Sequence, residues 1–449
     1  MITVTPSSIE KTVAVGDTKI VELNVQSTDT SYLVELESPV PQLVLSSDNG
    51  LTWSQSVELG NMTDETRVIK AKIFSAIPIS VVDNIVVNWE EPVPEPQWHA
   101  INSNYEALYL TSDIGPDGNI YVGGSFSDIN GVAGTSNLAR YNPSTDTWSA
   151  LGTGLNDICR SLKWNNGELY IGGSFTEANG APVNRIVKWT PTSGTEGTWS
   201  TLGTGLNGSC QSIEAVGNYL YTGGEFSSAG DTANTHGIAR WNIITSTWEA
   251  MGVGLRNQVG DPAGYTLSVL WDGGANVYVG GFFHAAGNVY LARGIARWNI
   301  TNKSWHAMGW GFDSGTVRTM VMAGTQLYVG GNFGSTGSTT VVNVARWNPS
   351  ASQWSSLGSG TSNGVSIQCN SLVWFNDELY AGGRFTRAGG HDDALRAAKF
   401  TPPSTWNKLG TGLNGDCNRL FVYNDDIYAV GNFTTAGDIP AGGVARWGL

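Results

Sequence analysis

Short stretches in which apolar and polar residues alternate follow one another along the whole chain, separated by turn-forming glycine, asparagine and aspartate. Alternation with a period of two residues favours half-buried β-strands, whereas a helix would repeat its apolar positions every three or four residues. Segments such as 20–25, 68–73 and 85–89 show this alternation clearly. The pattern therefore predicts an all-β protein.

The first ninety residues differ from the rest in having no internal repeat. Roughly seven or eight strands in this length predict a small immunoglobulin-like β-sandwich over residues 1–90. Residues 91–97 follow, with three prolines in the segment Glu91–Pro96. Proline-rich segments of this kind are stiff, so this segment is predicted to be a linker to a second domain at 98–449.

One phrase recurs about every 50 residues in the second domain: an apolar residue, Tyr, a variable residue and two glycines. Six copies begin at Ile120, Leu169, Leu220, Val277, Leu327 and Leu379, and a variant begins at Ile427. An apolar stretch precedes each copy, as in Cys159–Trp164. The glycine pair is expected to let neighbouring sheets approach closely.

Two further residue positions recur after each copy of the phrase, and we call each set of equivalent residues a column. The first is a cation in a strand that ends on an aromatic ring, at Arg140, Lys188, Arg240, Arg297, Arg346, Lys399 and Arg446. The second is a single tryptophan, at Trp98, Trp148, Trp199, Trp248, Trp305, Trp354 and Trp406. Each unit then has four short strands, and seven such units predict a seven-bladed β-propeller. The regular spacing of the cations indicates a structural role within each blade, against rings or loop carbonyls, rather than an anion channel.

The two ends of the repeat region complement each other. The chain finishes on a third strand at 444–449, with no fourth strand after it, whereas residues 98–101 form a fourth strand before the first unit. Pairing of these two segments would complete the seventh blade from one N-terminal strand and three C-terminal strands, and would leave no open sheet edge.

The repeated phrase, read as LYVGGxFxxAG followed by ARWNxxTxxWxxLG, resembles the kelch-like repeats of galactose-oxidase-type propellers. Such repeats also occur in phage structural proteins and bacterial surface proteins, and the resemblance covers residues 98–449. It implies the propeller fold but no activity, because nothing in the sequence matches the copper-binding tyrosine and histidine motif of galactose oxidase.

Composition narrows the partners. The net charge is −14, which argues against nucleic acid and anionic membranes, since both need clustered Lys and Arg. No apolar run approaches the ~20 residues that cross a bilayer, so no membrane insertion is expected. Neither a Gly-x-Ser-x-Gly motif nor a His pair at zinc-binding spacing occurs. We therefore expect no metal, no cofactor and no enzymatic activity.

Four cysteines, at Cys159, Cys210, Cys369 and Cys417, each lie eleven residues before the tyrosine of their own unit. This shared position predicts buried free thiols on the innermost strands, because equivalent sites on different blades lie too far apart for disulfides. Free thiols are compatible with folding in a reducing cytoplasm. The N-terminus has no basic and apolar leader, which fits the same compartment.

The connections between strands two and three, and between strand four and the next strand one, differ most between blades and share one face of the disc. Aromatic, imidazole and carboxylate groups occur in them, at Tyr265, His284, Tyr290, Trp310, His391, Asp392 and Asp393. Rings and hydrogen-bonding groups on a shallow surface suit sugars or a protein partner, although ordinary loop variation explains the same residues.

These features favour a non-enzymatic structural or adhesion protein of a bacteriophage or related virus, as a tail, fibre or capsid-decoration element. Such a protein folds in the host cytoplasm and acts outside it. The first domain would contact other virion proteins, and the propeller would face a host-surface glycan or protein. The alternative is a bacterial surface or secreted carbohydrate-binding adhesin.

Overall fold

A computed structural model of the protein describes residues 2–5, 8–13, 18–27, 32–37, 43–46, 56–62, 66–74, 79–84, 86–90, 96–101, 108–257, 264–313, 315–358 and 363–448. The chain forms two compact units, Met1–Glu95 and Pro96–Leu449. Residues 91–95 of the predicted linker lie outside the described residues. The described parts contain strands and turns but no helix, and hence no helix long and apolar enough to span a membrane.

The first unit consists of antiparallel strands. Its strands are β1 (Ile2–Thr5), β2 (Ser8–Val13), β3 (Thr18–Ser27), β4 (Tyr32–Glu37), β5 (Leu43–Ser46), β6 (Ser56–Met62), β7 (Thr66–Phe74), β8 (Ile79–Asn84) and β9 (Val86–Glu90). They form one sheet in the order β1-β3-β7-β5, a second in the order β6-β4-β9, and the pair β2-β8. The immunoglobulin-like topology remains a prediction.

The second unit is a seven-bladed β-propeller, which confirms the blade count predicted from the repeats. Seven antiparallel sheets have four strands each. The first strands are β11 (Leu108–Ile114), β15 (Cys159–Asn165), β21 (Ser209–Val216), β26 (Tyr265–Trp271), β31 (Gly315–Ala323), β37 (Cys369–Phe375) and β41 (Cys417–Tyr423). The second strands are β12 (Ile120–Ser125), β16 (Glu168–Gly173), β22 (Tyr219–Glu225), β27 (Asn276–Phe282), β32 (Gln326–Phe333), β38 (Glu378–Gly383) and β42 (Asp426–Gly431).

The outer half of each blade carries the cation and tryptophan columns. The third strands are β13 (Leu138–Asn142), β19 (Ile186–Ser193), β23 (Ile238–Asn242), β29 (Ile295–Asn299), β35 (Val344–Asn348), β39 (Ala397–Thr401) and β45 (Val444–Gly448). The fourth strands are β14 (Thr147–Ala150), β20 (Glu196–Thr201), β24 (Thr247–Ala250), β30 (Ser304–Ala307), β36 (Gln353–Ser356), β40 (Thr405–Lys408) and β10 (Gln97–Ala100). We number the blades 1 to 7 in the order of their first strands.

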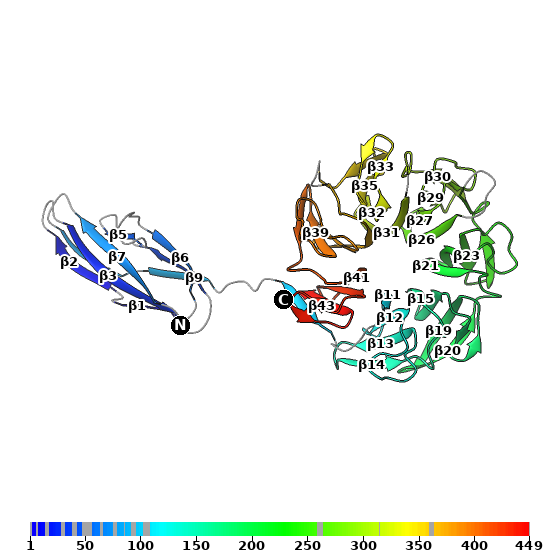
Figure 1. Ribbon diagram of the computed structural model, residues 1–449, viewed down its shortest axis with the longest axis horizontal. Helices are drawn as coiled ribbons and strands as arrows, with labels where there is room; N and C mark the ends of the chain where they lie inside the picture. The colour runs from blue at the N-terminus through cyan, green and yellow to red at the C-terminus, as the bar shows by residue number, and fades with distance from the viewer. Residues whose placement is uncertain are drawn as a thin grey trace. The chain divides into compact units, whose positions relative to one another are not determined.

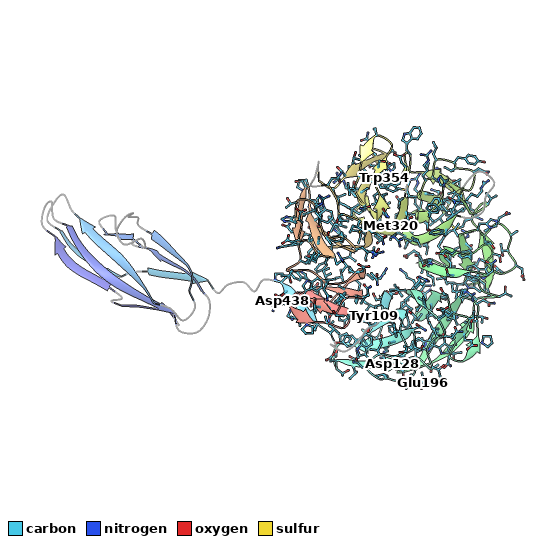
Figure 2. The ribbon with its side chains drawn as sticks, viewed as in Figure 1. Tyr109, Asp128, Glu196, Met320, Trp354 and Asp438 are labelled. Atoms are coloured by element: carbon cyan, nitrogen blue, oxygen red, sulfur yellow. The ribbon has the colours of Figure 1, made fainter. Side chains whose placement is uncertain are left out.

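The first strands surround the centre of the ring, where the labels β11, β15, β21, β26, β31 and β41 gather in Figure 1. Each contacts the first strand of the next blade, and β41 contacts β11. Figure 2 accordingly shows Tyr109 and Met320 nearer the centre than Glu196 and Asp438 at the rim. In blade 7 the sheet order is β10-β45-β42-β41, so that its fourth strand precedes blade 1 in the sequence.

Neighbouring blades pack closely because of the first glycine in each pair. A Cβ atom added at Gly172 would lie 2.4 Å from Sγ of Cys210 on the next blade, closer than atoms can approach. The same close approach joins Gly123 to Cys159, Gly330 to Cys369 and Gly382 to Cys417. The close approach predicted for the glycine pair is thus confirmed for its first member.

The four cysteines are buried at these contacts and form no disulfide in the structure. Burial raises the pKa of each thiol well above its ordinary value. The thiolate is the reactive form of cysteine, so a raised pKa keeps these thiols unreactive. Their role is packing between blades, in agreement with the position predicted for them on the first strands.

The tryptophan of strand four also links neighbouring blades, a role that the sequence did not indicate. Nε1 of Trp248 donates a hydrogen bond of 3.0 Å to the carbonyl of Leu202, one blade earlier. The same bond runs from Trp305 to Met251, from Trp354 to Met308, from Trp406 to Leu357 and from Trp98 to Leu409. Each ring thereby satisfies a carbonyl group of the adjoining sheet.

Because the strands of each sheet are antiparallel, the two-three and four-one connections lie on the same face of the disc, which we call the loop face. Short strand pairs stiffen it. They are β17 (Glu177–Ala178) with β18 (Ala181–Pro182), β25 (Leu255–Arg256) with β28 (Ala285–Ala286), β33 (Ser335–Thr336) with β34 (Thr339–Thr340), and β43 (Thr435–Ala436) with β44 (Ile439–Pro440).

Candidate functional site

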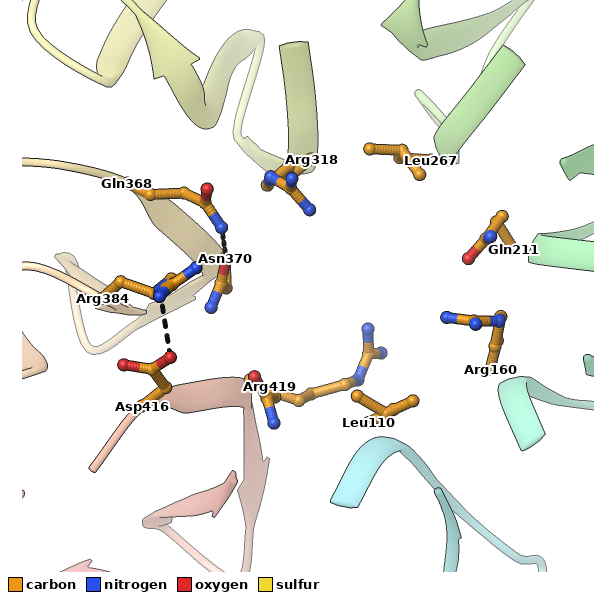
Figure 3. Close-up of a pocket in the computed structure, with 11 residues that line it drawn as sticks. Leu110, Arg160, Gln211, Leu267, Arg318, Gln368, Asn370, Arg384, Asp416 and Arg419 are labelled. Carbon is orange, nitrogen blue, oxygen red and sulfur yellow. Dashed lines mark hydrogen bonds and ion pairs between the residues drawn. The ribbon is translucent and has the colours of Figure 1, made fainter. Parts of the chain in front are cut away.

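A cavity of about 340 Å³ lies at the centre of the ring. Its lining includes Gln368 and Asp416, which directly precede β37 and β41, and Arg384, which directly follows β38. These residues belong to four-one and two-three connections. The cavity therefore opens on the loop face. Figure 3 shows its lining residues around a central space.

A β-bulge in each first strand supplies the ring of residues around this cavity. In β15, for example, the pairing with β16 skips Arg160 between Cys159 and Ser161. An extra residue in a bulge stands outside the regular ladder and is re-aimed. The skipped residues of the seven blades are Leu110, Arg160, Gln211, Leu267, Arg318, Asn370 and Asn418, and all seven line the cavity.

The second glycine of each pair makes room for this bulge. A Cβ atom at Gly173 would lie 2.1 Å from the carbonyl oxygen of Ile158, which directly precedes the first strand of the same blade, and one at Gly383 would lie 2.2 Å from that of Gln368. The two glycines of the phrase thus have separate purposes. The first leaves room for the neighbouring blade, and the second leaves room for the bulge that points a side chain into the cavity.

Four arginines, Arg160, Arg318, Arg384 and Arg419, line the cavity, against one carboxylate, Asp416. That carboxylate is already engaged, because Arg384 Nε lies 3.1 Å from its Oδ2. Arg396 Nε lies 3.4 Å from its Oδ1. In a protein of net charge −14, the mouth of the cavity is therefore locally positive.

Arg318 and Arg419 differ from the other two in having no hydrogen-bond or ion-pair partner among the described residues. Arg160 donates from Nε to Ser174 Oγ at 3.2 Å, and Arg384 pairs with Asp416. Arg318 and Arg419 instead extend into the open space of the cavity, one from blade 5 and the other from blade 7 (Figure 3).

The surrounding protein lowers the pKa of both free guanidinium groups, chiefly by removing water from around them. Nearby Asp113 and Glu214 partly offset this effect at Arg419, and Arg384 adds to it at Arg318. Both side chains remain charged at neutral pH, since an arginine titrates far above it. Both residues are exposed in the open cavity, and their charge is not neutralised by a contacting carboxylate.

Deeper in the ring, a second cavity of about 340 Å³ adjoins the first and shares Arg160, Arg318 and Arg419 with it. Asp113 and Glu214 lie in this part. Loss of hydration raises the pKa of both carboxyls, although Lys163 Nζ pairs with Glu214 Oε1 at 3.0 Å. The two carboxyls of the second cavity, Asp113 and Glu214, thus lie below the mouth, near Lys163 and the three shared arginines.

Arg419 also breaks the pattern of the repeat. The residue that resumes the ladder after the bulge has a hydroxyl group in the other six blades, as Thr111, Ser161, Ser212, Ser268, Thr319 and Ser371. Four of these hydroxyl groups accept a backbone N–H from the next blade. In blade 7 this position is Arg419, opposite Val430, which replaces the first glycine.

The cavity residues were not among the sites predicted from the sequence. Arg160 and Arg318 belong to a column whose members differ from blade to blade, so they have no repeat signature. Arg419 could have indicated the cavity from the sequence, because it is a cation at a position that has a hydroxyl group in the other six blades. The residue after each cysteine was a second signal, since it marks the bulge in four blades.

Blade 4 contains three of the site residues predicted from the sequence and brings two of them, Tyr265 and His284, together around Phe282. The ring of Tyr265 packs against Phe282 with centroids 5.5 Å apart, and that of Phe282 meets His284 at 6.2 Å. Tyr290 is 51% exposed and lies beneath the guanidinium of Arg256, at 5.8 Å. Tyr265 and His284 thus flank Phe282, whereas Tyr290 packs with Arg256 in the same blade.

The other predicted residues lie elsewhere on the same face. Trp310 is 60% exposed and packs over Gly337 at the tip of the β33–β34 hairpin. His391, Asp392 and Asp393 are exposed in blade 6, between β38 and β39. Asp393 forms an ion pair with Lys408, which lowers the pKa of its carboxyl. Within the described residues, no hydrogen bond, ion pair or ring contact joins these groups to Tyr265, His284 or Tyr290.

The cation column on strand three is structural, as predicted, but most of its partners are carboxylates rather than rings or loop carbonyls. Lys188 pairs with Glu168 at 2.7 Å and Arg240 with Glu249 at 2.6 Å, each within its own blade. Arg240 also lies over the ring of Tyr219. Arg140, Lys399 and Arg446 likewise pair with Asp117, Glu378 and Asp426.

A protein family described as a domain of unknown function (DUF5122) beta-propeller matches residues 115–144 and 165–195, within the first two blades. No curated protein sequence matches the chain. In the described residues, no group of three or more His, Cys, Asp or Glu side chains is arranged to hold a metal ion.

Solved structures resemble the chain in fold. One is the extracellular domain of BT4673 from B. thetaiotaomicron, at 13% identity and a TM-score of 0.48, covering 78% of this chain and 40% of that one. Another is the GH74 xyloglucanase from Xanthomonas campestris, at 12% identity and 0.47, covering 75% and 52%. A chain of the mitotic checkpoint complex gives 12% identity and 0.50, covering 80% and 95%. At these identities the likeness concerns the fold alone.

Proposed function

We propose that this protein is a non-catalytic structural and adhesion component of a bacteriophage or related virus, a tail, fibre or capsid-decoration element. The N-terminal unit attaches to other virion proteins, and the propeller presents its loop face to a glycan or protein on the host surface. The alternative is a bacterial surface or secreted carbohydrate-binding adhesin, which would use the same face.

The observation that carries the binding role is the distribution of exposed large hydrophobic side chains. Six such residues occur in the described part of the chain, and five of them lie in two-three or four-one connections. Those five are Tyr290, Leu291, Trp310, Ile367 and Ile439, and the sixth is Ile244. Exposed rings and aliphatic groups gathered on one face are typical of a surface that meets a partner.

The buried thiols support folding in a reducing compartment. A disc of seven blades whose four cysteines stay unpaired needs no oxidising environment, unlike many secreted proteins of bacteria. A virion protein folds inside the host cell and acts outside it, and this is why we favour it over a secreted adhesin.

The proposal also covers the type of blade, the fold of the N-terminal domain and the closure of the ring. We infer kelch-like blades, an immunoglobulin-like N-terminal domain and a ring closed by pairing of β10 with β45. A closed ring has no free sheet edge, which suits a module displayed on a particle.

A glycan array tests the binding role. The full chain should bind at least one immobilised glycan, and Trp310→Ala or Tyr290→Ala should each weaken that binding by about tenfold, since exposed aromatic anchors often dominate an interface. Ile244→Ala is the matched control, because Ile244 is 71% exposed in the turn between β23 and β24, on the opposite face. Equal binding by all four proteins would refute the loop face as the receptor site.

Mass spectrometry of purified particles separates the two biological settings. For a virion protein, the chain is recovered in density-purified particles from the strain that carries its gene. For an adhesin, it is recovered instead from the cell surface or the medium of cells without particles.

A further inference from the structure

We propose that the mouth of the central cavity is a specific site for an oxyanion, a carboxylate, sulfate or phosphate group carried by a molecule of about monosaccharide size. This site is distinct from the aromatic residues of the loop face. It does not depend on whether the protein belongs to a virion or to a cell surface.

The donor groups suit an oxyanion. Arg318 and Arg419 reach the cavity from blades 5 and 7, and Arg160 reaches it from blade 2 (Figure 3). A guanidinium group presents two parallel N–H donors, which match two oxygens of a carboxylate, sulfate or phosphate. Three such groups around one space can surround a tetrahedral or planar anion.

Among the described residues, no carboxylate of the protein itself pairs with Arg318 or Arg419 and would compete with a bound anion. Asp416 is the one carboxylate among the described lining residues, and it is held at the edge by Arg384 and Arg396. The amide of Asn370 is also occupied, because its Nδ2 donates to the carbonyl of Cys417 at 3.0 Å. Arg318 and Arg419 therefore keep their donor groups available, while the residues around them are fixed.

The energetics favour a bound anion. Neither free guanidinium group has a contacting carboxylate among the described residues, so an anion between them would gain charge-assisted hydrogen bonds without breaking an internal ion pair. The walls of the cavity are protein, so the attraction is less screened there than at an exposed surface. The net charge of −14 on the whole chain repels large polyanions, which leaves small ligands as the class that can enter.

The departure of blade 7 from the repeat supports the same site. A repeat that is maintained for packing keeps Ser or Thr after the bulge, and those hydroxyls join adjacent blades. Arg419 replaces that packing group with a charged side chain directed at the cavity. Among the described residues Arg419 forms no such hydrogen bond, and its effect is to add positive charge to the cavity that Arg160 and Arg318 also line.

The size of the space sets the class of ligand. A cavity of about 340 Å³ lies at the lower end of the range for small-molecule sites. It is larger than a bare anion requires and fits a sugar or another small organic group attached to one. A charged saccharide, such as a uronic acid or a sugar phosphate or sulfate, has this size and this charge.

Isothermal titration calorimetry on the full chain at low ionic strength tests the proposal, with sodium sulfate, D-glucuronate and D-glucose as probes. Sulfate and glucuronate should each bind saturably with a stoichiometry of one, and neutral glucose should not bind. Tighter binding of glucuronate than of sulfate indicates a carboxylated saccharide, and the reverse order indicates a sulfated or phosphorylated one. No saturable binding of either anion would overturn the proposal.

Two substitutions and one matched control locate the site. Arg318→Gln and Arg419→Gln should each weaken anion binding by about tenfold, because each removes a charge-assisted hydrogen bond. The control is Arg346→Gln, on strand three of blade 5, where Nε donates to Ser355 Oγ outside the cavity. Equal loss in all three variants, or in none, would exclude this cavity as the site.

Melting temperatures and the loop-face variants complete the test. Arg419→Gln should melt close to the parent, since its exposed side chain has no hydrogen-bond or ion-pair partner among the described residues, so weak binding by a folded variant is attributable to the site. Trp310→Ala should bind sulfate like the parent. Loss of glycan binding in Trp310→Ala alone, with sulfate binding retained, supports both proposals; loss of sulfate binding in it would refute the separation of the two sites.

Discussion

The indole ring of Trp98 lies edge-on to that of Trp447, with centroids 5.3 Å apart and an interplanar angle of 62°. The two residues are also direct partners in the pairing of β10 with β45. Nε1 of Trp98 donates to the carbonyl of Leu409 in blade 6, 311 residues later in the sequence. One buried side chain from the start of the propeller thus contacts two blades at its end.

If this contact closes the ring, Trp98→Ala should destabilise the propeller by about 3–5 kcal/mol, the usual cost of removing a buried aromatic ring. Trp98→Phe keeps a ring but loses the hydrogen bond, and it should cost only about 1–2 kcal/mol. Urea denaturation followed by tryptophan fluorescence measures both. A free energy of unfolding unchanged in Trp98→Ala would mean that the fourth strand of blade 7 contributes little.

A second prediction concerns the contact between Gly172 and Cys210. Gly172→Ala should destabilise the protein by about 1–3 kcal/mol, because the new methyl group overlaps Sγ of the neighbouring blade. Gly334→Ala is the control, since no described atom lies within 4 Å of a Cβ added there.

The double variant Gly172→Ala/Cys210→Ala tests whether the overlap is the cause. Removing the sulfur leaves room for the methyl group, so the two substitutions should cost less together than the sum of their separate effects. Strictly additive values, measured by the same denaturation experiment, would point to a different origin of the loss.

The four thiols offer a third prediction. They are buried, and the raised pKa of each keeps it in the unreactive thiol form. Titration with a thiol reagent at neutral pH should therefore detect four groups in denaturant and few or none in the native protein. Rapid reaction of the native protein would contradict the packing described here, and a disulfide detected by mass spectrometry would contradict the reduced state.

The sequence predicted the blades well because contacts between blades repeat. Gly172 and Trp248 meet neighbouring sheets in the same way as their equivalents, so the same residue type recurs at a fixed spacing. The role of Trp248 was still not apparent, because a periodic tryptophan fits packing within a blade equally well. Its hydrogen bond to Leu202 depends on the three-dimensional offset between sheets.

The cavity could not be predicted from the repeat, because each blade contributes a different residue to it. Arg160 and Leu110 occupy equivalent bulges but share no chemistry, and only the arrangement of the seven blades brings Arg160, Arg318 and Arg419 to one space. Tyr265 and Trp310 were predicted as site residues because the connections between strands vary from blade to blade, although Tyr265 is in fact the first residue of β26. Arg160, Arg318 and Arg419 lie within the first strands, where the repeat indicated packing.

The acidic groups below the cavity lead to a last prediction, on pH. Dehydration raises the pKa of Asp113 and Glu214, so each binds its proton more tightly in the folded chain than in the unfolded one. As the pH rises through these raised pKa values, both become negative near Arg419, while Lys163, Arg160, Arg318 and Arg384 stay positive. Sulfate affinity should therefore fall with rising pH, and sulfate suits the measurement because its own charge is constant in this range.

Glu214→Gln isolates one of the two carboxyls. At acidic pH, where Glu214 is protonated, variant and parent should bind sulfate alike, whereas at neutral pH the variant should bind more tightly because it lacks the charge and frees Lys163. The stability of the parent should follow the same sign, since a group with a raised pKa in the folded state loses its contribution as the pH rises through that value. The melting temperature of the variant relative to the parent should accordingly increase with pH. An affinity for sulfate that rises with pH, or a difference between the two proteins that does not change with pH, would show that Glu214 does not act on the arginines of the cavity.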